Sequence, residues 1–480
     1  MLQGTGSDVG KSVLTAALCR IAKRRGISVA PFKPQNMSNN AAACPGGGEI
    51  GRAQALQARA AGVQPTTDMN PVLLKPETDR AAQVIVHGKA RNTMQAADYM
   101  ANRDELMDSV LESFERLRTT HDLVLVEGAG SPAEINLRDR DIANMGFARR
   151  ADVPVCLIGD IDKGGVIASL VGTQNVISAK DAEMIEGFVI NKFRGDISLF
   201  DDGVRFIETR TGWPCFGVVP WISATAELPA EDAVTLKQPA PSRSRSIKIV
   251  APMLSRIANF DDADPLRLEP GIDFQWVPPG QPLPRDADLI ILFGTKSTIG
   301  DLAFLRAQGW DYDIIAHARS DGRVFGICGG YQMLGETISD PDGLDGPSGT
   351  VNGLGLLKVD TEMTAGKTIA QVAGTCARSG IALRGYEIHT GRTTGPDTER
   401  PFALLSGQPD GARSPDGMIE GTYLHGAFSA DVFRRSWLQL FGHSAAGTSS
   451  YDARVDAALD RLADGVEASL DIDALFELAR

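Results

Sequence analysis

The sequence predicts an α/β protein of two domains, the first built on a doubly wound parallel sheet. In the first half of the chain, short apolar runs alternate with longer amphipathic stretches, which is the pattern of βαβ units. At 480 residues the chain is too long for a single ordinary hydrophobic core. Residues 237–246 are rich in Pro, Ser and Arg and build no packed element, so we expect an interdomain linker there.

Apolar runs in the first half give the expected strands of the first domain. They are Ile27–Lys33, Leu123–Glu127, Val153–Asp160, Gly187–Asn191 and Cys215–Pro220. Asn102–Leu117 carries apolar side chains at helical spacing and is predicted to form a crossover helix. Right-handed crossovers bring the loops after these strands to one sheet edge, where ligands of open α/β sheets bind.

Strand signals resume after the linker, so the second half is predicted to be another α/β domain. They lie at Ile247–Ala251, Ala287–Phe293, Val324–Ile327 and Met418–Tyr423. After Tyr451, apolar residues recur every three or four positions, which predicts one or two closing helices. The expected division is therefore a first domain over 1–236, a linker over 237–246, a second domain over 247–445 and a C-terminal helical segment over 446–480.

The composition excludes several classes of function. A net charge of −13 opposes binding to nucleic acid. No apolar run approaches the length of a membrane span and no secretory signal is recognisable, so we expect a cytoplasmic protein. Six scattered cysteines without a C-x-x-C pair argue against a disulfide framework and a zinc site. Small molecules are the expected partners, and a homo-oligomer remains open.

A glycine-rich turn near the N-terminus predicts a phosphate site. It consists of Gly4, Thr5, Gly6, Ser7, Asp8, Val9, Gly10, Lys11 and Ser12. Backbone N–H groups of such a turn point at a phosphate chain, the lysine neutralises the outer phosphates, and the serine hydroxyl can ligate Mg²⁺. Thr5 stands where the first glycine of the strict pattern belongs, so the loop is one residue longer. With three residues before Gly4, its leading strand is expected to be almost absent.

Polar residues at strand ends are candidates for the rest of this ATP site. Glu127 follows a strand and is the expected second Mg²⁺ ligand beside Ser12. Asp160 and Asp162 either hold metal or substrate or cap the following helix. Asn191 either hydrogen-bonds the adenine edge or is a polar strand end. Glu49 is a reserve candidate that could equally cap a helix.

A second constellation predicts a nucleophilic cysteine. Cys328 lies on a G-x-C-x-G turn between a strand and a helical stretch, where the helix N-terminus lowers the thiol pKa and offers backbone N–H groups. His425, directly after an apolar strand, is the expected base. His389 lacks that setting, and a binding or structural role is expected for it.

Two further pieces fit the cysteine site. Gly294 and Thr295 follow a strand and, with Gly329, are expected to supply oxyanion N–H groups. Gln332 could hold a substrate glutamine.

The loop and the cysteine site carry resemblances to known families. The lengthened loop resembles that of dethiobiotin synthetase and related carboxylate-activating ATPases. Cys328 with His425 far downstream is similar to the class I glutamine amidotransferases. In their common form a glutamate two residues after the histidine orients its imidazole, but here Ala427 stands at that position. The catalytic group is therefore expected to be a dyad of Cys328 and His425 and not a triad. A backbone carbonyl or another carboxylate would fix the His425 tautomer.

Over essentially its whole length the chain resembles the cobalamin-biosynthetic glutamine amidotransferases. The matching segments are Phe32–Asn40, Met69–Pro76, Asp139–Asn144 and Ile190–Asp196, together with the cysteine site. The lack of the triad glutamate is typical of this family. The resemblance implies ATP- and glutamine-dependent amidation of the b, d, e and g carboxylates of adenosylcobyrinic acid a,c-diamide through an acyl phosphate, with ammonia passing along a shielded path.

Two alternatives to this function remain in view. Cobyrinic acid a,c-diamide synthase, or another ligase of this kind, shares both domains, but the sister enzyme resembles a carboxylate-bearing motif where this chain has Gln35–Asn40. A partitioning P-loop ATPase with a degenerate second domain is disfavoured by the intact cysteine and histidine.

Overall fold

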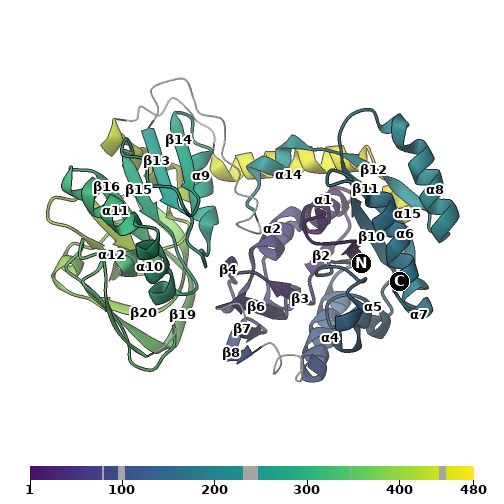
Figure 1. Ribbon diagram of the computed structural model, residues 1–480, viewed down its shortest axis with the longest axis horizontal. Coiled ribbons are helices and arrows are strands. Elements are labelled where there is room, and N and C mark those ends of the chain that lie inside the picture. The colour runs from purple at the N-terminus through teal and green to yellow at the C-terminus, as the bar shows by residue number, and fades with distance from the viewer. Residues whose placement is uncertain (78–80, 96–102, 231–246, 346–347, 443–449, 480) are drawn as a thin grey trace.

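The computed structural model in Figure 1 describes residues 1–77, 81–95, 103–230, 247–345, 348–442 and 450–479. The predicted linker at 237–246 lies outside the described residues. Two domains stand side by side, and helix α14 (Tyr451–Glu467) runs from one to the other. No helix among the described residues is both long and apolar enough to cross a membrane.

The first domain is built on parallel strands, as predicted. Its central sheet has the order β1-β10-β11-β12, and the parallel pair β2-β9 joins it through a bridge between Leu2 and Glu127. The strands are β1 (Leu2–Gly4), β2 (Val29–Phe32), β9 (Leu123–Val126), β10 (Val155–Asp160), β11 (Ile185–Phe193) and β12 (Cys215–Pro220). The expectation of an almost absent leading strand is wrong, because the short strand β1 pairs with β10 along its whole length.

Helices surround this sheet and follow its strands. They are α1 (Lys11–Arg24), α2 (Arg52–Ala61), α4 (Arg103–Thr120), α5 (Met145–Ala151), α6 (Val166–Val176), α7 (Ala179–Ala182) and α8 (Asp201–Thr211). Helix α4 confirms the predicted crossover helix. The small residues of α1, such as Ala16, Ala17 and Ala22, are fully buried, which lets the helix pack closely on its neighbours.

A small β-lobe was not expected from the sequence. It comprises β3 (Gln35–Met37), β4 (Ala41–Ala43), β5 (Glu49–Gly51), β6 (Val72–Pro76), β7 (Ala81–Val86) and β8 (Lys89–Gln95). Figure 1 shows this lobe on the side of the first domain that faces the second. Ala41, Leu73 and Ile85 of the lobe share a small apolar cluster with Ile388 of the second domain. The lobe therefore forms part of the domain interface.

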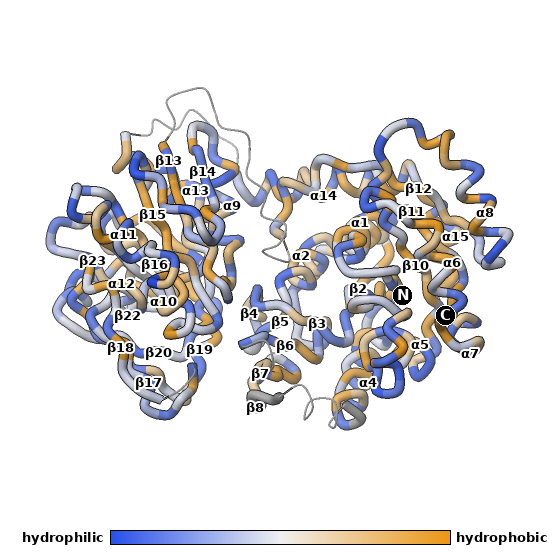
Figure 2. The backbone as a smooth tube through the Cα atoms, in the orientation of Figure 1, coloured by the Kyte–Doolittle hydropathy of each residue, from blue (hydrophilic) through white to orange (hydrophobic). Residues whose placement is uncertain are grey.

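The second domain has a central sheet of order β14-β13-β15-β16-β24-β23, parallel except for the edge strand β23. Its strands are β13 (Ile247–Pro252), β14 (Ile272–Val277), β15 (Leu289–Leu292), β16 (Arg323–Ile327), β23 (Ala412–Arg413) and β24 (Ile419–Thr422). Its helices are α9 (Asp264–Arg267), α10 (Thr298–Ala307), α11 (Trp310–Arg319), α12 (Gly329–Leu334) and α13 (Asp431–Leu438). Figure 2 shows hydrophobic segments concentrated on β13 and β15, where the core lies.

A second, mostly antiparallel sheet flanks this core. It comprises β17 (Thr337–Asp340), β18 (Gly349–Asn352), β19 (Asp360–Cys376), β20 (Ala382–Thr394), β21 (Ala403–Leu405) and β22 (Gln408–Asp410). The long hairpin β19–β20 reaches the small β-lobe, where Gln371 Nε2 donates to the Ala43 carbonyl at 3.1 Å.

The predicted C-terminal helices belong to the first domain. Helix α14 and the following α15 (Ile472–Glu477) share one apolar core with α1. Leu459, Leu462 and Val466 of α14 are buried there with Leu18 and Ile21 of α1. Ion pairs border the contact, including Arg20 with Asp460 at 2.7 Å. The chain thus leaves the first domain, builds the second and returns.

Candidate active sites

The glycine-rich turn follows β1 and leads directly into α1, as a phosphate loop does. Gly10 has a φ of 99°, and a Cβ there would stand 2.3 Å from Asn191 Nδ2, so only glycine fits. Lys11 folds back over the loop and donates to the carbonyls of Gly6 at 3.1 Å and Gly130 at 3.2 Å. The lysine is thereby held beside the space that outer phosphates would occupy.

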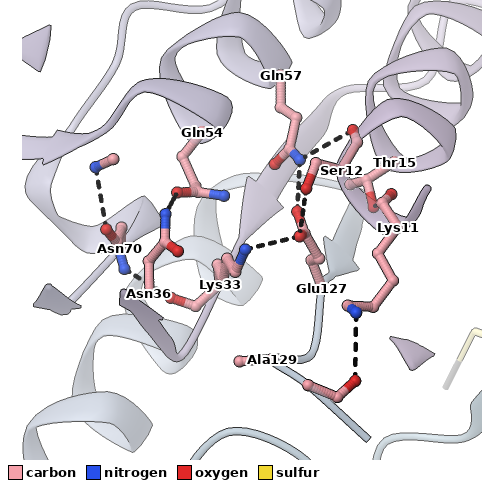
Figure 3. Close-up of polar contacts among 12 residues, drawn as sticks. Lys11, Ser12, Thr15, Lys33, Asn36, Gln54, Gln57, Asn70, Glu127 and Ala129 are labelled. Carbon is pink, nitrogen blue, oxygen red and sulfur yellow. Dashed lines mark hydrogen bonds and ion pairs between the residues drawn. The ribbon is translucent and has the colours of Figure 1, made fainter. Parts of the chain in front are cut away.

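Glu127 is the centre of a polar cluster beside the loop (Figure 3). The carboxylate is fully buried and accepts hydrogen bonds from Ser12 Oγ at 2.7 Å, Lys33 Nζ at 2.8 Å and Gln57 Nε2 at 2.6 Å. Gln57 also donates to the Ser12 carbonyl at 3.2 Å. The structure therefore brings the two predicted magnesium ligands together, and it adds Lys33 and Gln57 as hydrogen-bond donors to Glu127.

The donor set of this cluster fits Mg²⁺. Ser12 and Glu127 offer hard oxygen atoms next to each other, and Mg²⁺ in nucleotide sites typically takes one or two protein oxygens together with phosphate oxygens. Among the described residues there is no group of three or more His, Cys, Asp and Glu side chains that could hold a metal by itself. A metal here would accordingly depend on the phosphates of the nucleotide.

The remaining candidates of the first domain lie around the loop. Asn191 Nδ2 donates to the Val9 carbonyl at 2.8 Å, so it supports the loop, and its contact with adenine stays a prediction. Asp160 pairs with Lys192 at 2.8 Å and accepts from the backbone N–H of Asp162 at 2.9 Å. These contacts shape the turn after β10. Neither aspartate caps the following helix α6, whose N-cap is Gly165 without a side-chain cap, and the metal or substrate role stays a prediction.

Cys328 lies on a sharp turn between β16 and α12. Its φ is 53°, a left-handed conformation that is strained for a residue with a side chain, and it occupies the N-cap position of α12. The turn is tight, because a Cβ on Gly330 would stand 2.0 Å from the Leu292 carbonyl oxygen. The Cys328 thiol donates to the Ile388 carbonyl at 3.5 Å, and its electrostatic neighbour is His425, which lies just beyond β24. The predicted nucleophile and base therefore meet.

Asp262 orients His425 and completes a triad. Its Oδ2 accepts from His425 Nδ1 at 2.7 Å and its Oδ1 accepts from the Gly426 N–H at 2.6 Å. The expectation of a dyad is therefore wrong, and of the two partners foreseen for the imidazole, another carboxylate is the one present. Asp262 belongs to the short helix η6 (Phe260–Ala263), far upstream of His425 in the chain, with no strand-end motif to mark it.

The electrostatics of the triad favour a charged histidine. Burial acts to lower the pKa of His425, but Asp262 and Cys328 outweigh it and raise the pKa from 6.5 to about 10. At neutral pH the histidine is then an imidazolium beside the sulfur, which is the arrangement that stabilises a thiolate. His389 differs, because burial lowers its pKa to about 4 and it stacks on Tyr423 at 3.9 Å.

The predicted oxyanion residues lie against the nucleophile. A Cβ on Gly294 would stand 3.2 Å from His425 Cε1 and 3.7 Å from Cys328 Cβ. A Cβ on Gly329 would stand 3.2 Å from the Thr295 backbone nitrogen. The loop after β15 and the start of α12 thus face each other across the site.

Gln332 lies buried on α12, the helix that begins at the nucleophile. Its side chain is buried, its Oε1 accepts from Thr298 Oγ1 at 3.0 Å and its Nε2 donates to the Tyr423 hydroxyl at 3.1 Å. Both ends of the amide bond within the protein, and direct contact with a substrate glutamine stays a prediction.

The two sites approach each other across the domain interface. The segment that starts at Lys33 beside Glu127 ends at Asn40, whose Oδ1 accepts from the Asn259 N–H at 2.7 Å. Asn259 Nδ2 lies 3.5 Å from His425 Nε2. The Gln35–Asn40 motif therefore spans the distance between the phosphate cluster and the triad.

Glu49 also belongs to this interface. It is fully buried and pairs with Lys75 at 2.5 Å and with Lys367 of β19. It does not cap α2, whose N-cap residue is Gly51, so that alternative is wrong. The contacts that the structure shows for it form an ion pair across the interface.

Comparisons with known proteins agree with this geometry. Residues 1–236 match a family model described as CobQ/CobB/MinD/ParA nucleotide binding domain, and residues 248–433 match a CobB/CobQ-like glutamine amidotransferase domain. A cobyric acid synthase of Hyphomonas neptunium is 65% identical over 100% of this chain and 97% of its own length. One of Paracoccus denitrificans is 65% identical over 100% of this chain and 99% of its own. The chain therefore belongs to the cobyric acid synthase family of amide-forming ligases.

Proposed function

We propose that the chain amidates the b, d, e and g carboxylates of adenosylcobyrinic acid a,c-diamide, using ATP to activate each carboxylate and glutamine to supply the nitrogen. The observation that carries this proposal is the presence of two complementary sites in one chain. A phosphate loop with Lys11 stands beside Glu127, and a Cys328–His425–Asp262 triad faces it through the contact of Asn40 with Asn259. ATP and glutamine are metabolites of the cytoplasm, where we place the reaction.

In the glutaminase half, the Cys328 thiolate attacks the side-chain carbonyl carbon of glutamine. The negative charge passes to the carbonyl oxygen, which backbone N–H groups of Gly294, Thr295 and Gly329 would stabilise. The His425 imidazolium gives its proton to the departing nitrogen, so ammonia leaves and a thioester remains. Water, deprotonated by His425, then cleaves the thioester to glutamate and restores the thiol.

In the synthetase half, a corrinoid carboxylate attacks the γ-phosphorus of ATP and ADP departs. The phosphate loop and Lys11 hold the phosphate chain, and Lys33, which lies beside Glu127, would pair with a carboxylate or phosphate oxygen of the substrates. When bound by Ser12 and Glu127, Mg²⁺ would neutralise charge on the phosphates. Ammonia attacks the carbonyl carbon of the acyl phosphate, phosphate leaves, and the amide forms after loss of one proton.

Ammonia has to travel between these halves without meeting bulk water, where it would be protonated at neutral pH. Such a passage would have to cross the contact between the domains, where buried amide side chains lie between His425 and Glu127. They are Asn259, Asn40, Asn36 and Gln54.

The decisive experiment is incubation with ATP, Mg²⁺, glutamine and the corrinoid, followed by mass spectrometry. We expect four successive mass increments of one amidation each, whereas an a,c-diamide synthase would act on the corrinoid that lacks those two amides. Cys328→Ala should abolish the reaction with glutamine and retain it with high ammonium. Lys11→Ala should abolish both. If Cys328→Ala stops both reactions while the fold is intact, the two-site proposal is wrong.

A further inference from the structure

Arg52 is a residue of the first domain that reaches into the second. It begins helix α2, and its guanidinium pairs with Asp261 Oδ2 at 3.1 Å and donates to the Tyr386 hydroxyl. The guanidinium carbon also lies 5.1 Å from the centre of the Tyr386 ring. The side chains of Arg52 and Asp261 are only 16% and 13% exposed, so this is a largely buried ion pair in which a missing partner is costly.

Both groups that Arg52 contacts support His425. The Tyr386 ring stacks on the imidazole with ring centres 5.1 Å apart and planes inclined by 12°. The backbones of Tyr386 and His425 exchange two hydrogen bonds, at 2.9 and 3.1 Å. Asp261 is the direct neighbour of Asp262, whose carboxylate holds His425 Nδ1. Arg52 therefore touches the ring on one side of the imidazole and the short helix on the other.

The charges around Arg52 explain what the guanidinium contributes. Its ionisable neighbours are Asp261, Asp262, Tyr386 and Tyr451. Burial raises the pKa of Asp261, Arg52 acts to lower it and Asp262 raises it further. Two adjacent buried carboxylates repel each other, and the guanidinium offsets this repulsion. Without it, Asp261 would take up a proton or turn away, and helix η6 would no longer hold Asp262 in place.

We propose that Arg52 is a positioning residue for glutamine hydrolysis, supplied to the glutaminase by the ATPase domain. It acts through Tyr386 and Asp262 and contacts neither glutamine nor the reacting sulfur. The proposal rests on the proposed function only in assigning glutamine hydrolysis to Cys328 and His425. It means that the triad of the second domain reaches its working geometry only when the first domain is docked against it.

The test uses the full-length chain with Arg52→Met, Arg52→Lys and, as a matched control, Arg59→Met. Arg59 lies on the same helix and also forms ion pairs, but with Asp452 at 2.9 Å and Asp456 at 3.0 Å of α14. Glutamine hydrolysis is measured as glutamate release over a pH series, giving kcat and KM. Ammonium-driven amidation of the corrinoid reports separately on the ATP site.

For Arg52→Met we expect kcat for glutamine hydrolysis to fall by about tenfold to a hundredfold, the range for a misplaced catalytic group. KM for glutamine should stay close to the wild-type value, because Arg52 touches no substrate. The alkaline limb of the pH profile should shift, since the environment of His425 changes. Arg52→Lys, which keeps the charge, should recover part of the loss, and ammonium-driven amidation should remain in both variants.

Unchanged hydrolysis in Arg52→Met would overturn the proposal, and so would an equal loss in Arg59→Met, which would show a general effect of disturbing α2. If Arg52→Met does not fold, the comparison of Arg52→Lys with wild type decides, and wild-type kcat and pH profile in that variant count against the positioning role. A wild-type enzyme that hydrolyses glutamine but amidates no corrinoid would refute the proposed function and leave this comparison intact.

Discussion

Replacing Asp262 with Asn tests whether the carboxylate controls His425. The change keeps the shape of the side chain and removes its charge. The pKa of His425 is raised from 6.5 to about 10. Since one pKa unit corresponds to about 1.4 kcal/mol, the surroundings favour the imidazolium by about 5 kcal/mol. Asp262 contributes more to this stabilisation than Cys328 does, so we assign the larger share, about 3 kcal/mol, to the aspartate.

If that stabilisation is lost in the transition state, glutamine hydrolysis should fall by about a hundredfold. The pH profile should change as well. Because Asp262 raises the pKa of His425, its removal lowers that pKa, and the imidazolium loses its proton at a lower pH. The alkaline limb of kcat/KM for glutamine hydrolysis should therefore move towards neutrality.

The assay is glutamate release by Asp262→Asn and the wild-type chain across a pH series, with ammonium-driven amidation as the control. That control should be unaffected, because Asp262 belongs to the glutaminase and the ATP site does not need it. Hydrolysis near the wild-type rate, or an alkaline limb that stays in place, would refute this reading of the triad.

Three further predictions concern other parts of the molecule. Glu49→Gln should lower the free energy of unfolding by about 3–5 kcal/mol, measured by urea titration, because it leaves buried lysines without a counter-charge. The pKa of Glu49 is about 2, against burial, because Lys367 and Lys75 lower it from 4.5. The contribution of Glu49 to the free energy of unfolding is therefore present above pH 4.5 and lost as the pH falls towards 2. The difference in unfolding free energy between variant and wild type should accordingly shrink in acid. Leu459→Ala in α14 should lower the free energy of unfolding of the first domain by about 2–5 kcal/mol, because it leaves a cavity in the core that α14 shares with α1. Thermal melting should show this loss in the first domain and not in the second. Gly294→Ala should slow glutamine hydrolysis and spare ammonium-driven amidation, because its methyl group would crowd His425 at 3.2 Å.

The sequence was most informative where function depends on local geometry. Cys328 and the phosphate loop were predictable because a strained turn and an anion-binding turn need glycines at fixed spacing. His425 could be chosen over His389 because it follows a strand at the sheet edge where the cysteine lies. Most parallel strands of both domains were also placed within a few residues, since long apolar runs have few alternatives, but β1 and β14 were missed.

The sequence was least informative where function depends on contacts between distant segments. Asp262 lies on a short helix in a loop, and only the fold brings it to His425. Gln332 was expected to contact glutamine, and only the fold shows that its amide also bonds to Thr298 and Tyr423. The sequence did not indicate the lysine partners of Glu49, because one of them, Lys367, comes from the second domain.

The path of α14 makes the second domain an insertion within the first. A chain that ended after the second domain would leave the apolar face of α1 exposed, since Leu459 and Leu462 of α14 pack against it. Cutting the backbone between β12 and β13 would, in contrast, leave both halves joined through the C-terminal helix. The boundary at which the two catalytic activities could be produced as separate polypeptides is therefore not one point in the sequence but two, and a functional ATPase half needs pieces from both ends of the chain.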